Sequence, residues 1–141
     1  MASRRKGRIL AFQALYFWDS NEVPVEELVR FAWLSDDKLK SMDEGIAAFS
    51  KNLVAGSIEN IETIDKSIKD HLVNWDITRL NRVDLAVLRI SVYTLMYQTD
   101  IPPSIVIDEA IGICREYGAD DSHKFVNGVL DSIKKTLQEK P

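Results

Sequence analysis

Residues 83–97 read VDLAVLRISVYTLMY and form the most apolar segment of the chain. Apolar side chains recur along it at the three- and four-residue spacing of an α-helix, and they do so on two sides. One side carries Leu85, Leu88, Val92 and Leu95, and the other carries Ala86, Ile90, Tyr93 and Tyr97. A helix with two apolar faces is typical of a central helix that several other helices contact.

Helical spacing continues through the N-terminal half of the chain. It predicts a helix over residues 4–18 that Ser3 caps, and a second helix over residues 25–34. A third helix is expected from about residue 42. A fourth helix, or a continuation of the third, ends near Trp75. The stretch NWDITRLN that follows reads as a connector with one short turn.

Two helices are predicted after the central segment. Pro102 disfavours helical geometry at the residue before it, so a new helix is expected over residues 103–117, ending at Gly118 as a C′ residue. A last helix covers residues 121–138. No segment alternates with the period of two that a strand requires. The sequence therefore predicts an all-α fold of about seven helices.

Composition favours one globular domain over residues 1–141. Apolar residues make up 45% of the chain and charged residues 28%, and no run of about 18 apolar residues suggests a membrane span or a secretion signal. We therefore expect a cytoplasmic protein that contacts no membrane. A single cysteine and two distant histidines argue against a disulfide and against a zinc site. No cofactor is predicted.

The charge of the chain is unevenly distributed. Residues 1–18 contain no acidic side chain, whereas the remaining residues carry 14 basic against 22 acidic side chains. The four basic residues of the first segment are Arg4, Arg5, Lys6 and Arg8. A cluster of this kind suits the binding of phosphate groups, because attraction between charges falls off within about 8 Å at physiological salt. A solvated helix end is the alternative that the residues leave open.

The stretch ADDSHKFVNGVLDSI, residues 119–133, places many polar groups at the start of the last helix. Ser122 and His123 are adjacent, so on a helix their side chains diverge by about 100° and cannot act together as nucleophile and base. Glycine-rich phosphate loops and zinc-protease or hydrolase motifs are missing from the sequence. We therefore predict a binding protein rather than an enzyme.

Four stretches of the chain resemble the NusB family of bacterial transcription antitermination proteins: RRKGRILAFQALYFW, VDLAVLRISVYTLMY, DIPPSIVIDEAIGICREYG and DDSHKFVNGVLDSI. The resemblance extends over essentially the whole chain and is weakest over residues 21–43. It implies two small helical bundles and binding to the boxA RNA of ribosomal-RNA leader transcripts. It also implies a complex with the ribosomal small-subunit protein NusE and with RNA polymerase and other Nus factors.

The resemblance also implies which residues contact single-stranded RNA. They are Arg4, Arg5, Lys6, Arg8 and Tyr16 in the first helix, and Asp121, Lys124 and Phe125 at the start of the last. Asp120 or Asp121 would cap the last helix, Lys124 would add positive charge, and Phe125 would offer a ring on which a base can stack. On helical spacing alone, a core position is favoured over a base platform for Phe125, and Tyr16 could equally be a core residue.

Three positions bear on binding of the protein partner, two that depart from the residue common in the family and one that matches it. Thr94 stands where a glutamate is common in the family, Asp108 where asparagine is frequent, and Asp84 where the family often has an acidic residue that contacts the partner. We therefore expect these three positions to influence NusE affinity. Family members occur as monomers and dimers, so a homodimer stays open.

Two other functions remain as alternatives. A NusB-like domain also forms the N-terminal RNA-binding part of certain ribosomal-RNA cytosine methyltransferases, although no glycine-rich cofactor segment follows before Pro141. The third possibility is a helical adaptor between proteins without RNA affinity.

Within the RNA-binding hypothesis, Gly7 weakens the first helix, so Gly7→Ala is expected to order that helix and tighten binding.

Overall fold

A computed structural model describes residues 2–21, 23–30, 43–73 and 76–139. These residues form seven α-helices, one 3-10 helix and no strand. The helices of the N-terminal half are α1 (Ala2–Asn21), α2 (Val25–Val29), α4 (Glu44–Glu59) and α5 (Ile61–Asp70). The 3-10 helix η1 (Ile77–Arg79) leads into α6 (Arg82–Tyr97), α7 (Pro103–Tyr117) and α8 (Ser122–Glu139). The predicted all-α class is confirmed.

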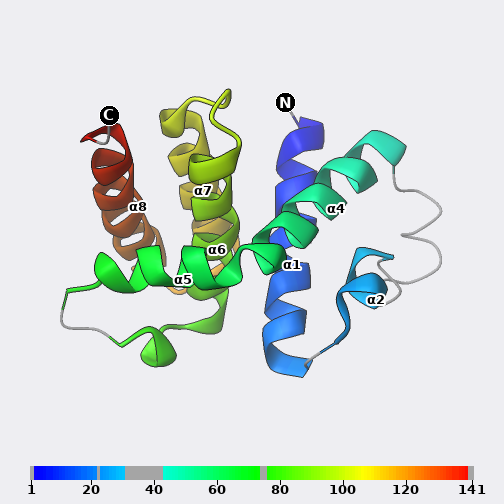
Figure 1. The fold of residues 1–141 in the computed structure, drawn as a ribbon, viewed down its shortest axis with the longest axis horizontal. Helices are drawn as coiled ribbons and strands as arrows, with labels where there is room; N and C mark the ends of the chain where they lie inside the picture. Colours follow the sequence, from blue (N-terminus) through cyan, green and yellow to red (C-terminus); the bar gives the residue numbers. More distant parts are fainter. Residues whose placement is uncertain (1, 22, 31–42, 74–75, 140–141) are drawn as a thin grey trace.

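The helices form two small bundles joined by α6 (Figure 1). One bundle consists of α1, α2 and α4, and the other of α6, α7 and α8, with α5 lying across the second bundle. α6 packs against α1, α4, α5, α7 and α8. Its interior residues include Leu85, Leu88 and Val92, which are almost fully buried. The predicted role of residues 83–97 as the central helix is therefore confirmed.

Two of the described α-helices, α4 and α6, begin at a residue whose side chain caps the first turn. The side chain of Asp43 accepts hydrogen bonds from the N–H groups of Gly45 and Ile46 at the start of α4. Asn81 does the same for α6, accepting from Val83 and Asp84. Each cap satisfies backbone donors that the first helical turn leaves unpaired. These polar residues thereby fix where α4 and α6 begin.

Several predicted helix boundaries differ from the observed ones. The first helix begins at Ala2 and continues to Asn21, and a new helix begins at Ile61 after the previous one ends at Glu59. The following helix ends at Asp70, five residues before the predicted end, and Trp75 lies outside the described residues. The predicted ends of the second helix and start of the third, residues 31–34 and 42, also lie outside them.

Gly118 is required for close packing rather than for a left-handed cap. Its φ of −93° and ψ of 179° are extended values that any residue adopts. A Cβ atom at this position would lie 2.8 Å from the carbonyl oxygen of Cys114 and 2.9 Å from the side chain of Ser122. The absence of a side chain therefore lets the end of α7 approach the start of α8, where the Ser122 hydroxyl accepts a hydrogen bond from the Ala119 N–H.

Gly7 likewise has a packing role that the sequence did not reveal. It is buried, and a Cβ atom there would lie 2.5 Å from the ring of Phe49 on α4. A separation below 3 Å forces the ring to move, which costs stability in a packed interior. Gly7 therefore keeps α1 close to α4, and the expectation that Gly7→Ala would simply order the helix is wrong.

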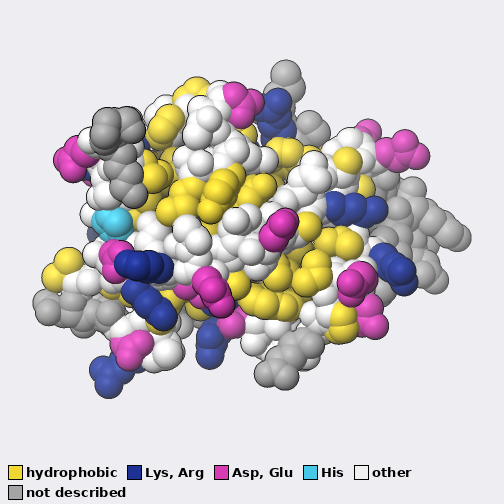
Figure 2. Space-filling model, in the orientation of Figure 1, with side chains coloured by type: hydrophobic (Ala, Val, Ile, Leu, Met, Phe, Trp, Pro, Cys, Tyr) yellow, Lys and Arg dark blue, Asp and Glu magenta, His cyan; other side chains and the backbone are white. Residues whose placement is uncertain are grey.

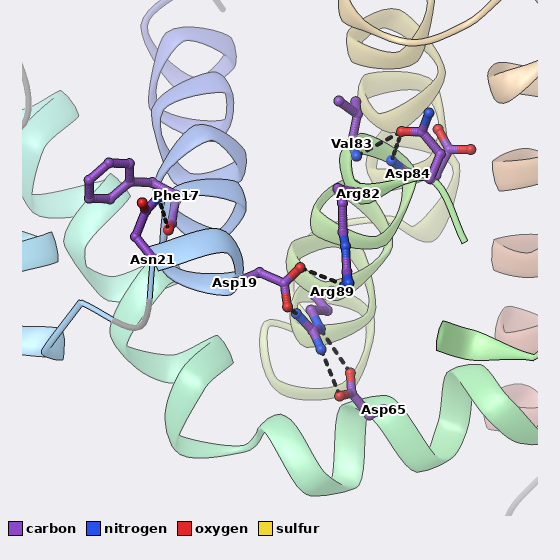
Figure 3. A network of polar contacts seen from close by, with 9 residues as sticks. Phe17, Asp19, Asn21, Asp65, Arg82, Val83, Asp84 and Arg89 are labelled. Carbon is purple, nitrogen blue, oxygen red and sulfur yellow. Dashed lines mark hydrogen bonds and ion pairs between the residues drawn. The ribbon is translucent and has the colours of Figure 1, made fainter. Parts of the chain in front are cut away.

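A cluster of charged residues joins the two bundles (Figure 3). Arg89 of α6 donates from Nε and Nη2 to the two carboxylate oxygens of Asp65 on α5, at 3.0 and 2.9 Å. Its Nη1 contacts Asp19 of α1 at 3.4 Å, and Arg82 contacts the other oxygen of Asp19 at 2.9 Å. The guanidinium of Arg89 also lies 5.8 Å from the ring centre of Trp18. Through this single side chain, α6 is connected to both α1 and α5.

Beyond the buried arginine, α6 presents an aromatic surface. Figure 2 shows hydrophobic side chains gathered in the middle of the visible face, where α4, α5 and α6 meet. Tyr93 and Tyr97 belong to α6 and their ring centres lie 5.3 Å apart. Gly56 of α4 makes room for Tyr93, because a Cβ atom there would overlap its ring. We call Tyr93 and Tyr97 the tyrosine face.

Among the described helices, none is long and apolar enough to cross a membrane.

Candidate RNA interface

The basic residues at the start of α1 fall into two groups. Arg4 and Lys6 are exposed, and the side chain of Arg5 is 42% exposed. Arg8, by contrast, is only 6% exposed. Three of the four predicted phosphate contacts are therefore on the surface, and one is in the interior.

Arg8 lies between α1, α4 and α7. Its Nη1 lies 3.7 Å from a carboxylate oxygen of Glu109, and its guanidinium is 5.5 Å from the ring centre of Phe49. Burial lowers the pKa of the Arg8 guanidinium, while the charge of Glu109 raises it and that of Arg4 lowers it. Arg8 anchors α1 to its neighbours, so we assign it no phosphate contact. Periodicity could not show this, because the burying residues come from other helices.

Arg5 lies across α7 at Gly112. A Cβ atom on Gly112 would come within 2.5 Å of the Arg5 guanidinium, so only glycine leaves that space. Glu109 lies 3.9 Å from the same guanidinium. Arg115, one turn further along α7, lines the same surface hollow and is exposed. Sequence reasoning missed Gly112 and Arg115, although their spacing from Asp108 marks one face of a helix.

The aromatic part of the surface follows along α1 and α7. The ring centres of Phe12 and Tyr117 are 5.2 Å apart, which joins the middle of α1 to the end of α7. Tyr16 lies one turn beyond Phe12 and is exposed, which places this tyrosine on the surface rather than in the core. Tyr117 is exposed as well, and sequence reasoning did not single it out. Two tyrosine rings, one on α1 and one at the end of α7, are thus accessible.

A groove of about 580 Å³ lies where the segment before α6 meets the start of α8. Residues of both segments line it, among them Arg79, Asn81, Asp84, Asp121, Ser122 and Phe125. Phe125 is partly buried and packs against the hydrophobic core while also lining the groove. The core position and the accessible ring, which the sequence treated as alternatives, are therefore combined in one residue.

Asp121 and Lys124 are exposed at the edge of this groove. The backbone carbonyl of Asp121 accepts from the N–H groups of Lys124 and Phe125, so Asp121 precedes the first turn of α8 as predicted. Its side chain lies 3.9 Å from Nζ of Lys124. The predicted residues at the start of α8 therefore lie together. The predicted residues of α1 form a separate group, spread over about 16 Å of helix between Arg5 and Tyr16. α7 connects this group to the start of α8.

The three predicted partner residues do not form one surface. Thr94 is buried, and its hydroxyl donates to the carbonyl of Ile90 within α6, so the expectation of partner contact at Thr94 is not supported. Asp108 of α7 is exposed and lines the same hollow as Arg5 of α1. Asp84 is buried at the groove. A partner would have to touch separate parts of the molecule to contact all three.

The chemistry of the described residues favours binding over catalysis. Within those residues, no group of three or more His, Cys, Asp or Glu side chains is placed to hold a metal ion. Burial raises the pKa of the Cys114 thiol to about 12, with a smaller effect of the Asp84 charge, so this thiol is protonated at neutral pH. Basic side chains, aromatic rings and hydrogen-bond acceptors follow one another on the surface along α7 toward the start of α8. This order suits an extended strand of nucleic acid.

Comparisons with known proteins identify relatives over most of the chain. The NusB family model matches residues 5–135. The transcription antitermination protein NusB of Treponema denticola is 56% identical over 131 residues, covering 93% of this chain and 95% of the relative. The protein of the same name from Borreliella burgdorferi is 39% identical over 132 residues, covering 93% of each chain.

Solved structures with the same fold are also similar in sequence. A structure of T. maritima NusB has a TM-score of 0.82 and 34% identity, covering 94% of this chain and 90% of that one. A structure of the antitermination factors NusB and NusE in complex with dsRNA has a TM-score of 0.85 and 32% identity. The latter match covers 96% of this chain and 98% of the other.

Proposed function

The chain belongs to the NusB family, and from this membership we propose that it is a transcription antitermination factor that binds boxA-like single-stranded RNA of ribosomal-RNA leader transcripts. It does so as one RNA-binding domain together with the ribosomal protein NusE, and joins the antitermination complex on RNA polymerase in the cytoplasm. A related structure contains NusB, NusE and dsRNA, which supports RNA and NusE as the classes of partner. The chain matches relatives named NusB over nearly their whole length, which favours this function over the methyltransferase alternative. No enzymatic activity is assigned.

One observation carries the RNA-binding proposal. Arg4, Arg5 and Lys6 are accessible on α1, Tyr117 is exposed at the end of α7 that leads to the groove, and Tyr16 is exposed on α1 one turn beyond Phe12, which contacts Tyr117. Positive charge binds the phosphates of a single strand, and aromatic rings stack on its unpaired bases. We call this surface, from Arg4 through Tyr117 to Phe125, the RNA track.

Salt dependence tests the basic part of the RNA track. If Arg4, Arg5 and Lys6 each contact one phosphate, the slope of log K against log salt is expected near −2 for single-stranded RNA. Affinity should then fall about tenfold to twentyfold between 50 and 200 mM salt. Fluorescence anisotropy with a labelled oligoribonucleotide measures this slope.

A charge-matched variant provides the control. Replacing Arg4, Arg5 and Lys6 by glutamine should reduce the slope toward zero. Replacing three exposed lysines elsewhere, Lys66, Lys69 and Lys135, removes the same charge and should leave the slope near −2. Equal slopes for the two variants would mean that binding follows net charge and that α1 has no special role.

Gly112→Ala tests whether the position of Arg5 matters. The added methyl group displaces the Arg5 guanidinium from α7, so RNA affinity should fall and the salt slope should weaken by about 0.7, the share of one phosphate. Stability should change little, because a flexible side chain can move and alanine favours the helix. Gly128→Ala is the matched control, since a Cβ atom there meets nothing within 4 Å. An RNA affinity of Gly112→Ala equal to that of Gly128→Ala would exclude a positioned Arg5.

The tyrosine face is the surface that we assign to NusE. It lies on α6 about opposite to Asp84, since positions 84 and 97 differ by roughly 220° around the helix, so NusE and RNA can bind at the same time. A solved structure of the same fold contains NusB, NusE and dsRNA together, which supports the proposal that the two partners use separate surfaces. Tyr97 is exposed and Tyr93 is partly buried beside it, and aromatic residues of this kind are typical of the centre of a protein interface.

Two tyrosines of similar exposure separate the surfaces. Tyr97 is 46% exposed on the tyrosine face, and Tyr117 is 39% exposed on the RNA track. Tyr97→Ala should weaken NusE binding at least fivefold and leave RNA affinity unchanged, because truncating a central aromatic residue costs more than about 1 kcal/mol. Tyr117→Ala should have the opposite pattern. NusE binding is measured by calorimetry. Sedimentation of the chain alone shows whether it forms a homodimer. A homodimer that occupies the tyrosine face would overturn this assignment.

A further inference from the structure

Glu109 of α7 lies between two arginines of α1. Its Oε2 is 3.9 Å from Nη1 of Arg5, and its Oε1 is 3.7 Å from Nη1 of Arg8. The side chain of Glu109 is 19% exposed, against 42% for that of Arg5 and 7% for that of Arg8. The three side chains therefore form a row that runs from the interior at Arg8 to the surface at Arg5.

The charges of this row leave the surface arginine positive. Burial lowers the pKa of the Arg8 guanidinium, and the charge of Glu109 opposes this effect. A buried cation needs a paired anion, so the negative charge of Glu109 is balanced first by Arg8. One negative and two positive charges leave one positive charge in excess. That charge is at Arg5, where a phosphate group can reach it.

Gly112 defines the position of Arg5 on a second side. A Cβ atom at Gly112 would lie 2.5 and 2.8 Å from the two terminal nitrogens of the Arg5 guanidinium, which therefore rests on the backbone of α7. Glu109 is three residues earlier, on the same face of the helix. Its Oε2 is buried and has no hydrogen-bond partner among the described residues. The attraction of this oxygen for Arg5 is therefore not shared with a hydrogen-bond donor.

We propose that Glu109 is a positioning residue for RNA binding, which holds the Arg5 guanidinium over Gly112 so that it is already ordered when a phosphate arrives. The inference rests on the proposed RNA binding and deepens it. A long side chain that is ordered beforehand loses less conformational freedom when the complex forms. Arg8 contributes without contacting RNA, because it balances the Glu109 carboxylate from the interior side.

The sign of the effect of Glu109→Gln distinguishes positioning from simple electrostatics. Glutamine keeps the size of the side chain and removes its charge, so Arg5 is no longer held. RNA affinity should fall about twofold to twelvefold, the effect of ordering one long side chain on binding. Asp108→Asn is the matched control, since Asp108 is the neighbouring residue, is exposed and lines the same hollow as Arg5. It should tighten RNA binding slightly, because repulsion of phosphate is reduced.

A double-mutant cycle with Arg5→Gln separates the positioning of Arg5 from a general effect on α1. Glu109→Gln leaves buried Arg8 without its carboxylate, and a shift of the whole helix would weaken the contacts of Arg4 and Lys6 as well. If Glu109 acts through Arg5, Glu109→Gln should cause no loss of affinity in a chain that already carries Arg5→Gln. A loss that persists there would overturn the positioning role. Anisotropy with labelled boxA-like RNA at low salt measures all four chains.

Nuclear magnetic relaxation of the arginine Nε–H groups tests the ordering in the parent chain. Arg4 and Arg8 are the references on the same helix, because Arg4 is exposed and Arg8 is buried. The order parameter of Arg5 on the picosecond-to-nanosecond timescale should lie clearly above that of Arg4. Equal values for Arg5 and Arg4 would overturn the proposal, and this comparison stays decisive even if Glu109→Gln folds poorly.

The outcomes separate this inference from the proposed function. If Glu109→Gln binds RNA as tightly as the parent chain or more tightly, the positioning role is overturned and RNA binding is intact. If Arg5→Gln binds RNA like the parent chain, Arg5 contacts no phosphate and the inference is overturned, while salt-dependent binding through Arg4 and Lys6 still supports the proposed function. If the parent chain binds no RNA at low salt, both are overturned.

Discussion

Arg89→Met is expected to lower the free energy of unfolding by about 3–5 kcal/mol, the cost of removing one partner from a buried ion pair. The Arg89 guanidinium forms a bidentate contact with Asp65 at 3.0 and 2.9 Å and contacts Asp19 at 3.4 Å. Methionine fills similar space but leaves the Asp65 carboxylate without its two donors. Since α1, α5 and α6 meet at this side chain, the loss should affect both bundles.

Arg82→Met is the matched control in the same cluster. Arg82 contacts Asp19 at 2.9 Å, but its side chain is 54% exposed, against 10% for Arg89. Exposed ion pairs contribute about 0–1 kcal/mol, so this variant should unfold nearly as the parent chain does. Urea denaturation followed by circular dichroism measures both values. Equal losses for the two variants would show that the cluster is only a surface feature.

Phe125 should reveal its two roles through two different substitutions. Phe125→Leu keeps apolar volume and removes the ring face, so RNA affinity is expected to fall by about 1–3 kcal/mol while stability stays close to that of the parent chain. Phe125→Ala removes the packing as well. It should lose the same RNA affinity and also about 2 kcal/mol of stability, less than the 3–5 kcal/mol for a fully buried phenylalanine, because Phe125 is partly buried.

The leucine variant decides between stacking and packing. Thermal unfolding and RNA anisotropy are measured on the same samples of both variants. If Phe125→Leu binds RNA as well as the parent chain, no base stacks on this ring and the groove contributes through other groups. If Phe125→Leu unfolds as early as Phe125→Ala, the ring is a core residue whose effect on RNA is indirect.

The helices could be predicted largely because their causes are local. Apolar spacing over residues 83–97 indicated the central helix, and Pro102 located the start of α7 at Pro103. Asp121 could be placed before α8 from the polar groups that precede an apolar run. Each of these features depends on neighbours a few residues away, so the sequence contains the information needed.

Features that depend on contacts between distant segments could not be predicted. Arg8 resembled the other basic residues until α4 and α7 were seen to enclose it. Thr94 lies on a face of α6 that neighbouring helices bury. The importance of Gly112 arises only because Arg5, far away in sequence, lies against it. Burial and close approach are properties of the packed molecule, which spacing alone does not encode.

Photo-crosslinking tests the central claim, that RNA follows α1 and α7 to the groove at α8, most directly. Single-stranded boxA-like RNA carrying 4-thiouridine is bound and irradiated, and the modified peptides are identified by mass spectrometry. The chain offers tyrosines on both faces, which makes the comparison internal. Crosslinks at Tyr16, Tyr117 or Phe125, with none at Tyr93 or Tyr97, are the predicted result. Crosslinks at Tyr93 and Tyr97, with Tyr16, Tyr117 and Phe125 unmodified, would contradict the account.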